Sequence, residues 1–133
     1  MTVGILLGET ELEGIPLSVR AARQFVRETL GEDHPVLEDV TLLVSELVTN
    51  AVAYSDSRLG GGTVRLSIGE LPGRRLHVVV LDDGSPYGVP RPRTAEPTDE
   101  NGRGLQILRA LAKRWGTYPE GARRAVWFQI TFR

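Results

Sequence analysis

The sequence predicts a single α+β domain over residues 1–133, a two-layer α/β sandwich in which helices cover one face of a mixed, mostly antiparallel sheet. A chain of 133 residues has room for one hydrophobic core rather than two. Apolar residues repeat with helical period in the first half of the chain and alternate with polar residues in much of the second half. The shares of hydrophobic residues, 41%, and of charged residues, 25%, are those of a globular domain.

The first predicted helix spans residues 18–30. Its apolar residues repeat at helical spacing, and they are Val19, Ala22, Phe25, Val26 and Leu30. Ser18 is a suitable N-cap, because its hydroxyl can accept a hydrogen bond from a free N–H of the first turn. Gly31 stands where helices commonly stop. We expect this helix to cover the core.

The second predicted helix spans residues 36–54. Its apolar face is made of Val36, Val40, Leu43, Val44, Leu47, Val48 and Ala51. Glu46 and Asn50 are four residues apart, and at about 100° per residue they lie together just outside one edge of that face. We expect them to project side by side along the rim of the surface on which the helix packs.

Strands are predicted over residues 63–68, 76–81 and 125–132. The middle strand is almost entirely apolar, so we expect both of its faces to be buried. A third helix is predicted over residues 105–115, with an apolar face made of Leu105, Leu108, Leu111, Ala112 and Trp115. The proline-rich segment 85–104 before it is expected to be a lid or a disordered loop, as long loops within compact domains usually are.

Composition excludes several classes of function. Lys and Arg number 16 and Asp and Glu number 17, and the net charge of −1 offers no electrostatic case for binding nucleic acid or an anionic membrane. The absence of cysteine excludes disulfides, thiolate nucleophiles and cysteine-ligated metals. The N-terminal pattern is not that of a signal peptide, and no apolar run approaches the ~18 residues of a membrane span. We therefore expect a soluble, cytoplasmic protein.

Three polar features stand out, and each has a plain structural explanation. Glu46 and Asn50 suit a solvated helix edge. The segment 82–84 (Asp-Asp-Gly), which ends the middle strand, suits a β-turn. The segment 102–104 (Gly-Arg-Gly) suits a flexible entry to the third helix.

Each feature also suits nucleotide binding. A carboxylate at a strand end can accept a hydrogen bond from the exocyclic amine of adenine, and glycines at a helix start expose N–H groups to phosphates. An Asn oxygen can ligate Mg²⁺, and a Glu can take a proton from an attacking hydroxyl. The sequence has no P-loop and no Rossmann fingerprint, so neither of those nucleotide sites is expected.

Three motifs, in a fixed order, carry a resemblance to a known family. The segment SELVTNAVAYS resembles the N-box of the GHKL ATPase superfamily, VVVLDDGSP resembles its first glycine box, and NGRGLQIL resembles its second. More narrowly, two segments are similar to the corresponding segments of small stand-alone serine/threonine kinases of the anti-sigma-factor type, in particular the actinobacterial ones. These segments are VSELVTNAV and GRGLQILRALAKRWG. The resemblance covers roughly residues 18–133. It implies a histidine-kinase-like sandwich of the GHKL (Bergerat) type that binds ATP and Mg²⁺.

The resemblance implies a role for each matching position. Asn50 would ligate Mg²⁺ between the phosphates, and Glu46 would act as the catalytic base or orient the acceptor. Asp82 would bind the adenine amine, with Asp83 as the competing choice; Asp82 is favoured because it matches the first position of the Asp-x-Gly pattern. The other cofactor-binding positions give room to the base or hold the lid end against the phosphates, and they are Gly84, Gly102, Arg103, Gly104 and Leu105.

One position departs from the family pattern. The first glycine box of the family has the pattern Asp-x-Gly-x-Gly, and Pro86 occupies the position of its second glycine. Proline has no N–H to donate and a fixed backbone angle. We expect reduced nucleotide affinity or an altered lid pose.

The resemblance implies an ATP-dependent protein serine/threonine kinase, a transcription regulator that phosphorylates an anti-sigma-factor antagonist of the STAS type and sequesters a sigma factor. No direct contact with nucleic acid or membrane is implied, and because similar proteins often dimerise, a homodimer is a candidate assembly. A non-catalytic ATP-binding module that regulates its partner by sequestration is the alternative, slightly favoured by Pro86. A domain without a ligand is the plainest competitor. A histidine kinase fragment would need a phosphoacceptor histidine on a hairpin ahead of the N-box, where only His34 of a His-Pro turn stands.

Overall fold

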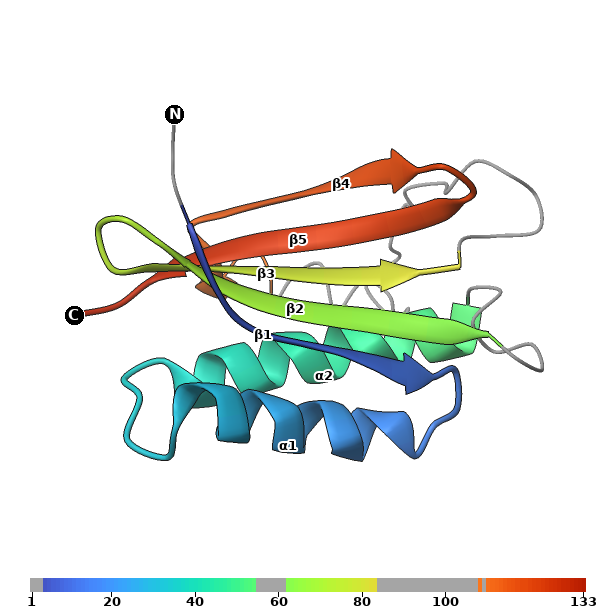
Figure 1. Cartoon of the computed structure of the whole chain (residues 1–133), viewed down its shortest axis with the longest axis horizontal. Coiled ribbons are helices and arrows are strands. Elements are labelled where there is room, and N and C mark those ends of the chain that lie inside the picture. The colour runs from blue at the N-terminus through green and yellow to red at the C-terminus, as the bar shows by residue number, and fades with distance from the viewer. Residues whose placement is uncertain (1–3, 55–61, 84–107, 109) are drawn as a thin grey trace.

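The computed structural model describes residues 4–54, 62–83, 108 and 110–133. These residues form two layers, a sheet and the helices α1 (Ser18–Leu30) and α2 (Leu37–Tyr54), which lie side by side against one face of it (Figure 1). The strand order is β1-β2-β3-β5-β4, with neighbours antiparallel throughout. The strands are β1 (Ile5–Glu13), β2 (Thr63–Leu71), β3 (Arg75–Asp82), β4 (Arg114–Glu120) and β5 (Arg123–Thr131). The predicted two-layer α+β fold with helices on one face is confirmed.

The hydrophobic core lies between the two layers. Strand residues point alternately to the two faces of a sheet, and those that face the helices are buried: Val64, Leu66, Ile68, Leu76, Val78, Val80, Phe128 and Ile130. The helices contribute Ala22, Val26, Val40, Leu43, Val44, Leu47, Val48 and Ala51. Removing this apolar surface from water, at about 25 cal/mol per Å², is the main force that holds the helices on the sheet.

β3 is buried on its inner face and only half-covered along most of its outer face. His77 and Val79 point outward and are half-buried, whereas Leu81 is buried there. The His77 ring stacks on Trp127 of β5, with the ring centroids 5.5 Å apart. In the described part of the chain both helices lie on the inner side, so the prediction that both faces of this strand are buried is wrong for most of its outer face.

The helices match their predicted ranges closely, and α1 matches exactly. Gly31 ends α1 with φ of 90°, and its N–H donates to the Arg27 carbonyl at 2.9 Å. The predicted N-cap is wrong: Ser18 is the first helical residue and is buried, Leu17 takes the cap position, and no side chain caps the turn. Within the described ranges, no helix is both long and apolar enough to cross a bilayer.

The sequence pattern does not predict two of the strands, β1 and β4. The predicted third helix is also too long at its C-terminal end, because Trp115 belongs to β4 and packs against the core from there. The Ala112 N–H still donates to the Leu108 carbonyl at 2.8 Å, as in a helix, but the next N–H, that of Lys113, donates to the Gln129 carbonyl of β5 at 2.8 Å. Pairing with β5 therefore ends the helix before the apolar pattern does.

Candidate functional site

Glu46 and Asn50 lie one turn apart on α2, both partly exposed, beside the buried face of that helix. The opposite edge of the same face is occupied, because Ser45 accepts a hydrogen bond from Arg23 Nε of α1 at 2.7 Å. At about 100° per residue, Glu46 and Asn50 fall on the edge of α2 that is turned away from that contact with α1. Their carboxylate and amide therefore lie at the margin of the helix layer, where they can reach a ligand.

Asp82 is the last residue of β3, and it is buried, with 2% of its surface exposed. It has the same parity along the strand as Leu76, Val78 and Val80, so its side chain lies on the face that packs against the helices. Arg124 is its cross-strand neighbour on β5, and Arg124 Nη2 lies 3.1 Å from Asp82 Oδ2. A buried carboxylate is thus held by a guanidinium at the end of the sheet.

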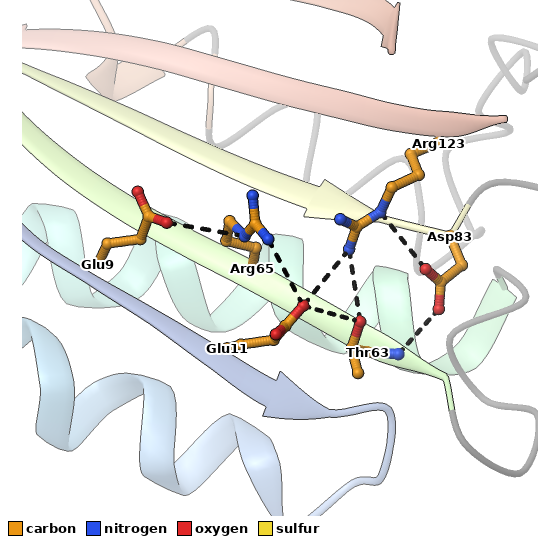
Figure 2. Close-up of polar contacts among 6 residues, drawn as sticks. All are labelled: Glu9, Glu11, Thr63, Arg65, Asp83 and Arg123. Carbon is orange, nitrogen blue, oxygen red and sulfur yellow. Dashed lines mark hydrogen bonds and ion pairs between the residues drawn. The ribbon is translucent and has the colours of Figure 1, made fainter. Parts of the chain in front are cut away.

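Asp83 has different partners, on the other side of the sheet (Figure 2). Its Oδ2 accepts a hydrogen bond from the Thr63 backbone N–H at 2.8 Å, and its Oδ1 lies 3.4 Å from Arg123 Nε. Arg123 also approaches Glu11, with 4.0 Å between Nη2 and Oε1. Asp83 therefore ties the end of β3 to the start of β2, which is a structural role.

The outer face of the sheet continues this cluster of charges (Figure 2). Arg65 lies 3.7 Å from a Glu9 oxygen and 3.9 Å from a Glu11 oxygen. These side chains are 43–50% exposed, so each ion pair contributes less than about 1 kcal/mol to stability. The cluster links strands β1, β2 and β5 through ion pairs.

Asp82 ends β3, and Asn50 and Glu46 lie four and eight residues before the last residue of α2. In Figure 1 the C-terminal end of α2 and the C-terminal end of β3 lie at the same end of the two layers. α2 packs on β2 and β3, and the inward side of Asp82 is the side on which α2 lies. The fold thus brings together two segments that are about 30 residues apart in sequence, each with the polar groups that the sequence singles out.

Comparisons with known proteins show the family to which this fold belongs. A family model described as "Histidine kinase-like ATPase domain" matches residues 12–130. The chain belongs to this family. The resemblance to GHKL proteins drawn from the three motifs is thereby confirmed, and so is the fold class that it implies.

Among curated relatives, this histidine kinase-like ATPase domain is similar to the serine-protein kinase RsbW of Bacillus velezensis, with 31% identity over 115 residues, 77% of this chain and 68% of the relative. It is 40% identical over 82 residues to the uncharacterized protein SCO4941 of Streptomyces coelicolor, which covers 59% of this chain and 76% of that protein.

A solved structure shows the same fold. It contains the RsbU and RsbW domains of Rv1364c from Mycobacterium tuberculosis, and it superposes with a TM-score of 0.65 at 19% identity. The match covers 93% of this chain and 32% of that larger one.

The structure describes only some of the predicted site residues of this ATPase-like domain. Glu46, Asn50 and Asp82 are placed as above. The remaining positions and Pro86 lie outside the described residues, as does the predicted lid; these positions are Gly84, Gly102, Arg103, Gly104 and Leu105. Among the residues that are described, no three His, Asp or Glu side chains gather as a metal site.

The sequence motifs do not predict a role for Arg124, which contacts Asp82. Arg124 lies just before the predicted strand 125–132, and its importance depends on the register between β3 and β5. That register joins residues 42 positions apart. The signal in the sequence is that two adjacent acids, Asp82 and Asp83, end one apolar strand and two adjacent arginines, Arg123 and Arg124, begin another.

Proposed function

We propose that this domain is an ATP- and Mg²⁺-dependent protein serine/threonine kinase that phosphorylates an anti-sigma-factor antagonist and sequesters a sigma factor. Membership of the histidine kinase-like ATPase family implies ATP binding, and similarity to serine-protein kinases named RsbW favours a protein as acceptor. The observation that supports the proposal is that Glu46 and Asn50 share one edge of α2, whereas Asp82 ends β3 on the face against which α2 packs.

The three described residues have the chemistry that bound ATP and Mg²⁺ need. Asp82 offers a buried carboxylate acceptor for the adenine amine, and burial excludes competing water. Asn50 offers a hard amide oxygen to Mg²⁺, at a partly exposed position on α2. When bound, the ion neutralises negative charge that develops on the phosphates during transfer.

Glu46 is the group proposed to handle the acceptor proton. It lies one helical turn before Asn50 on the same edge of α2, so a hydroxyl held beside it would be near phosphates held beside Asn50. A carboxylate in that position can accept the proton of an attacking serine or threonine hydroxyl or orient that hydroxyl. A protein acceptor is favoured, because Glu46 lies on a helix edge that is partly exposed and relatives are serine-protein kinases.

The proposed partners are a sigma factor and a STAS-type antagonist protein, and the proposed location is the cytoplasm. A homodimer is the proposed assembly. The rival proposal is a non-catalytic ATP-binding module that acts by sequestration, and Pro86 in the first glycine box favours it, because that residue has no N–H to donate.

The test is a phosphotransfer assay with labelled ATP, Mg²⁺ and an antagonist protein from the same genome. Label on a serine or threonine of the antagonist, lost with Glu46→Gln, supports the kinase. Tight ATP binding without label on any candidate antagonist supports the non-catalytic module. Failure to bind ATP by calorimetry rejects both.

A further inference from the structure

The ion pair between Arg124 and Asp82 is the most buried one in the described part of the chain. Their side chains are 24% and 3% exposed, and Nη2 and Oδ2 are 3.1 Å apart. The two residues face each other directly across β3 and β5, on the side of the sheet that packs against the helices. Arg124 lies outside the three family motifs.

Asp82 is the acidic partner of Arg124 among the described residues. Among the described residues, Arg124 Nε is buried without a hydrogen-bond partner, as are Arg75 Nε and Arg123 Nε, although most buried donors in proteins are paired. The contact of Nη2 with Asp82 is the one ion pair of this guanidinium within the described ranges. A charge-assisted hydrogen bond is directional, so the contact of 3.1 Å also orients the carboxylate.

The orientation of the Asp82 carboxylate affects which nucleotide base can form a hydrogen bond with it. A carboxylate paired with a guanidinium accepts hydrogen bonds and has none to donate. Adenine presents a donor, its amine, at position 6, whereas guanine presents a carbonyl oxygen there. A carboxylate fixed as an acceptor toward this edge therefore attracts adenine and repels guanine.

We propose that Arg124 is a positioning residue that sets the preference for adenine over guanine, by holding the Asp82 carboxylate in place as an acceptor. This inference rests on the proposed role of Asp82 in ATP binding. It goes beyond that role because it assigns base specificity to a pair on two strands rather than to one residue. The competing explanation is that the ion pair only stabilises the pairing of β3 with β5.

Arg123 supplies a matched control. It is the neighbour of Arg124, has a similar exposure of 26%, and pairs with the neighbouring acid Asp83 at 3.4 Å, but on the outer face. Both ion pairs, Arg123–Asp83 and Arg124–Asp82, connect the end of β3 to the start of β5. A link to the nucleotide is proposed for only one of them.

The experiment measures ATP and GTP dissociation constants by calorimetry, with Mg²⁺, for the full chain and the variants Arg124→Met, Arg124→Lys and Arg123→Met. We expect Arg124→Met to weaken ATP binding about tenfold and to reduce the ratio of GTP to ATP dissociation constants by a similar factor. Arg124→Lys, which restores a cation, should recover part of the ratio. Arg123→Met should lower the melting temperature and leave the ratio at the wild-type value.

If Arg124→Met keeps the wild-type ratio of GTP to ATP dissociation constants, this inference is wrong. The proposal that the domain binds ATP is not affected by that result. If Arg124→Met does not fold, Arg124→Ala takes its place, since it also removes both the donor and the charge, and a wild-type ratio there is equally decisive. A ratio lowered as much by Arg123→Met as by Arg124→Met also overturns it. Wild-type protein that binds no ATP rejects the proposed function together with this inference.

Discussion

Arg23 of α1 donates a hydrogen bond from Nε to the Ser45 hydroxyl of α2, with 2.7 Å between nitrogen and oxygen. The same hydroxyl donates to the Thr41 carbonyl at 2.7 Å, and Ser45 is buried. This polar contact therefore joins α1 to α2 at one position beside their buried apolar residues. Because Glu46 follows Ser45 directly, this contact also fixes the rotation of α2 that sends Glu46 to the opposite edge.

The first prediction concerns the stability of this contact. Ser45→Ala removes the acceptor of Arg23 Nε and should lower the free energy of unfolding by about 1–2 kcal/mol, measured by urea denaturation. Thr49→Ala is the control, because the Thr49 hydroxyl donates to the Ser45 carbonyl of its own helix and Thr49 is exposed. An equal loss in both variants would show that the link between the helices contributes nothing.

The second prediction separates Asp82 from Asp83. Asp82→Asn should weaken ATP binding by about 10–100-fold, because it replaces an ionised acceptor by a neutral amide. Asp83→Asn should instead lower thermal stability, since Asp83 holds the Thr63 N–H and Arg123, with a smaller effect on ATP. Calorimetric titration and thermal melts of both variants check this. Equal wild-type affinities for ATP and GTP would contradict the assignment of Asp82.

The third prediction distinguishes the two residues on the edge of α2. Asn50→Ala should remove the dependence of ATP affinity on Mg²⁺. Glu46→Gln should keep ATP affinity and slow phosphoryl transfer by about 10²–10⁴-fold if the carboxylate is a general base. Glu38→Gln removes a carboxylate from the exposed first turn of the same helix and serves as the control. Full transfer activity in Glu46→Gln would make Glu46 a structural residue.

The fourth prediction concerns pH. Burial lowers the pKa of His77 from its ordinary value of 6.5, so the unfolded chain binds a proton there at higher pH than the folded chain does. The sign follows from linkage: the contribution of His77 to stability is fully present above about pH 6.5 and is lost as the pH falls below it. Thermal melts between about pH 7.5 and 5.5 should show a smaller loss for His77→Gln than for wild type. A larger loss in the variant would mean that protonated His77 stabilises the fold.

The outer-face partners of His77 support this direction. The ring stacks on Trp127, and its Nδ1 lies 3.1 Å from Gln129 Nε2. An amide nitrogen donates, so the ring nitrogen that faces it accepts, which requires that nitrogen to carry no proton. Protonation of His77 would lose this hydrogen bond as well as place a charge in a half-buried position.

The helices are the part of the fold that the sequence determines by itself. The range 18–30 is confirmed to the residue, and the second helix starts one residue later than predicted. Helical periodicity is a local property of 10 to 20 consecutive residues, and the backbone hydrogen bonds that it accompanies are local too. The pairing of Glu46 with Asn50 on one edge of α2 and the three motifs of the family are likewise contained in short stretches of sequence.

Pairing in the sheet is what only the tertiary structure decides. β1 has three exposed apolar residues followed by alternating acids, a pattern that becomes a strand only because β2 pairs with it. The register of β3 with β5 sends Asp82 inward to Arg124 and leaves Asp83 with Arg123 on the outer face. Antiparallel pairing joins residues dozens of positions apart, and a shift of one residue would exchange the two faces. The sequence therefore names both acids as candidates, whereas the register decides which of them lies among the helices.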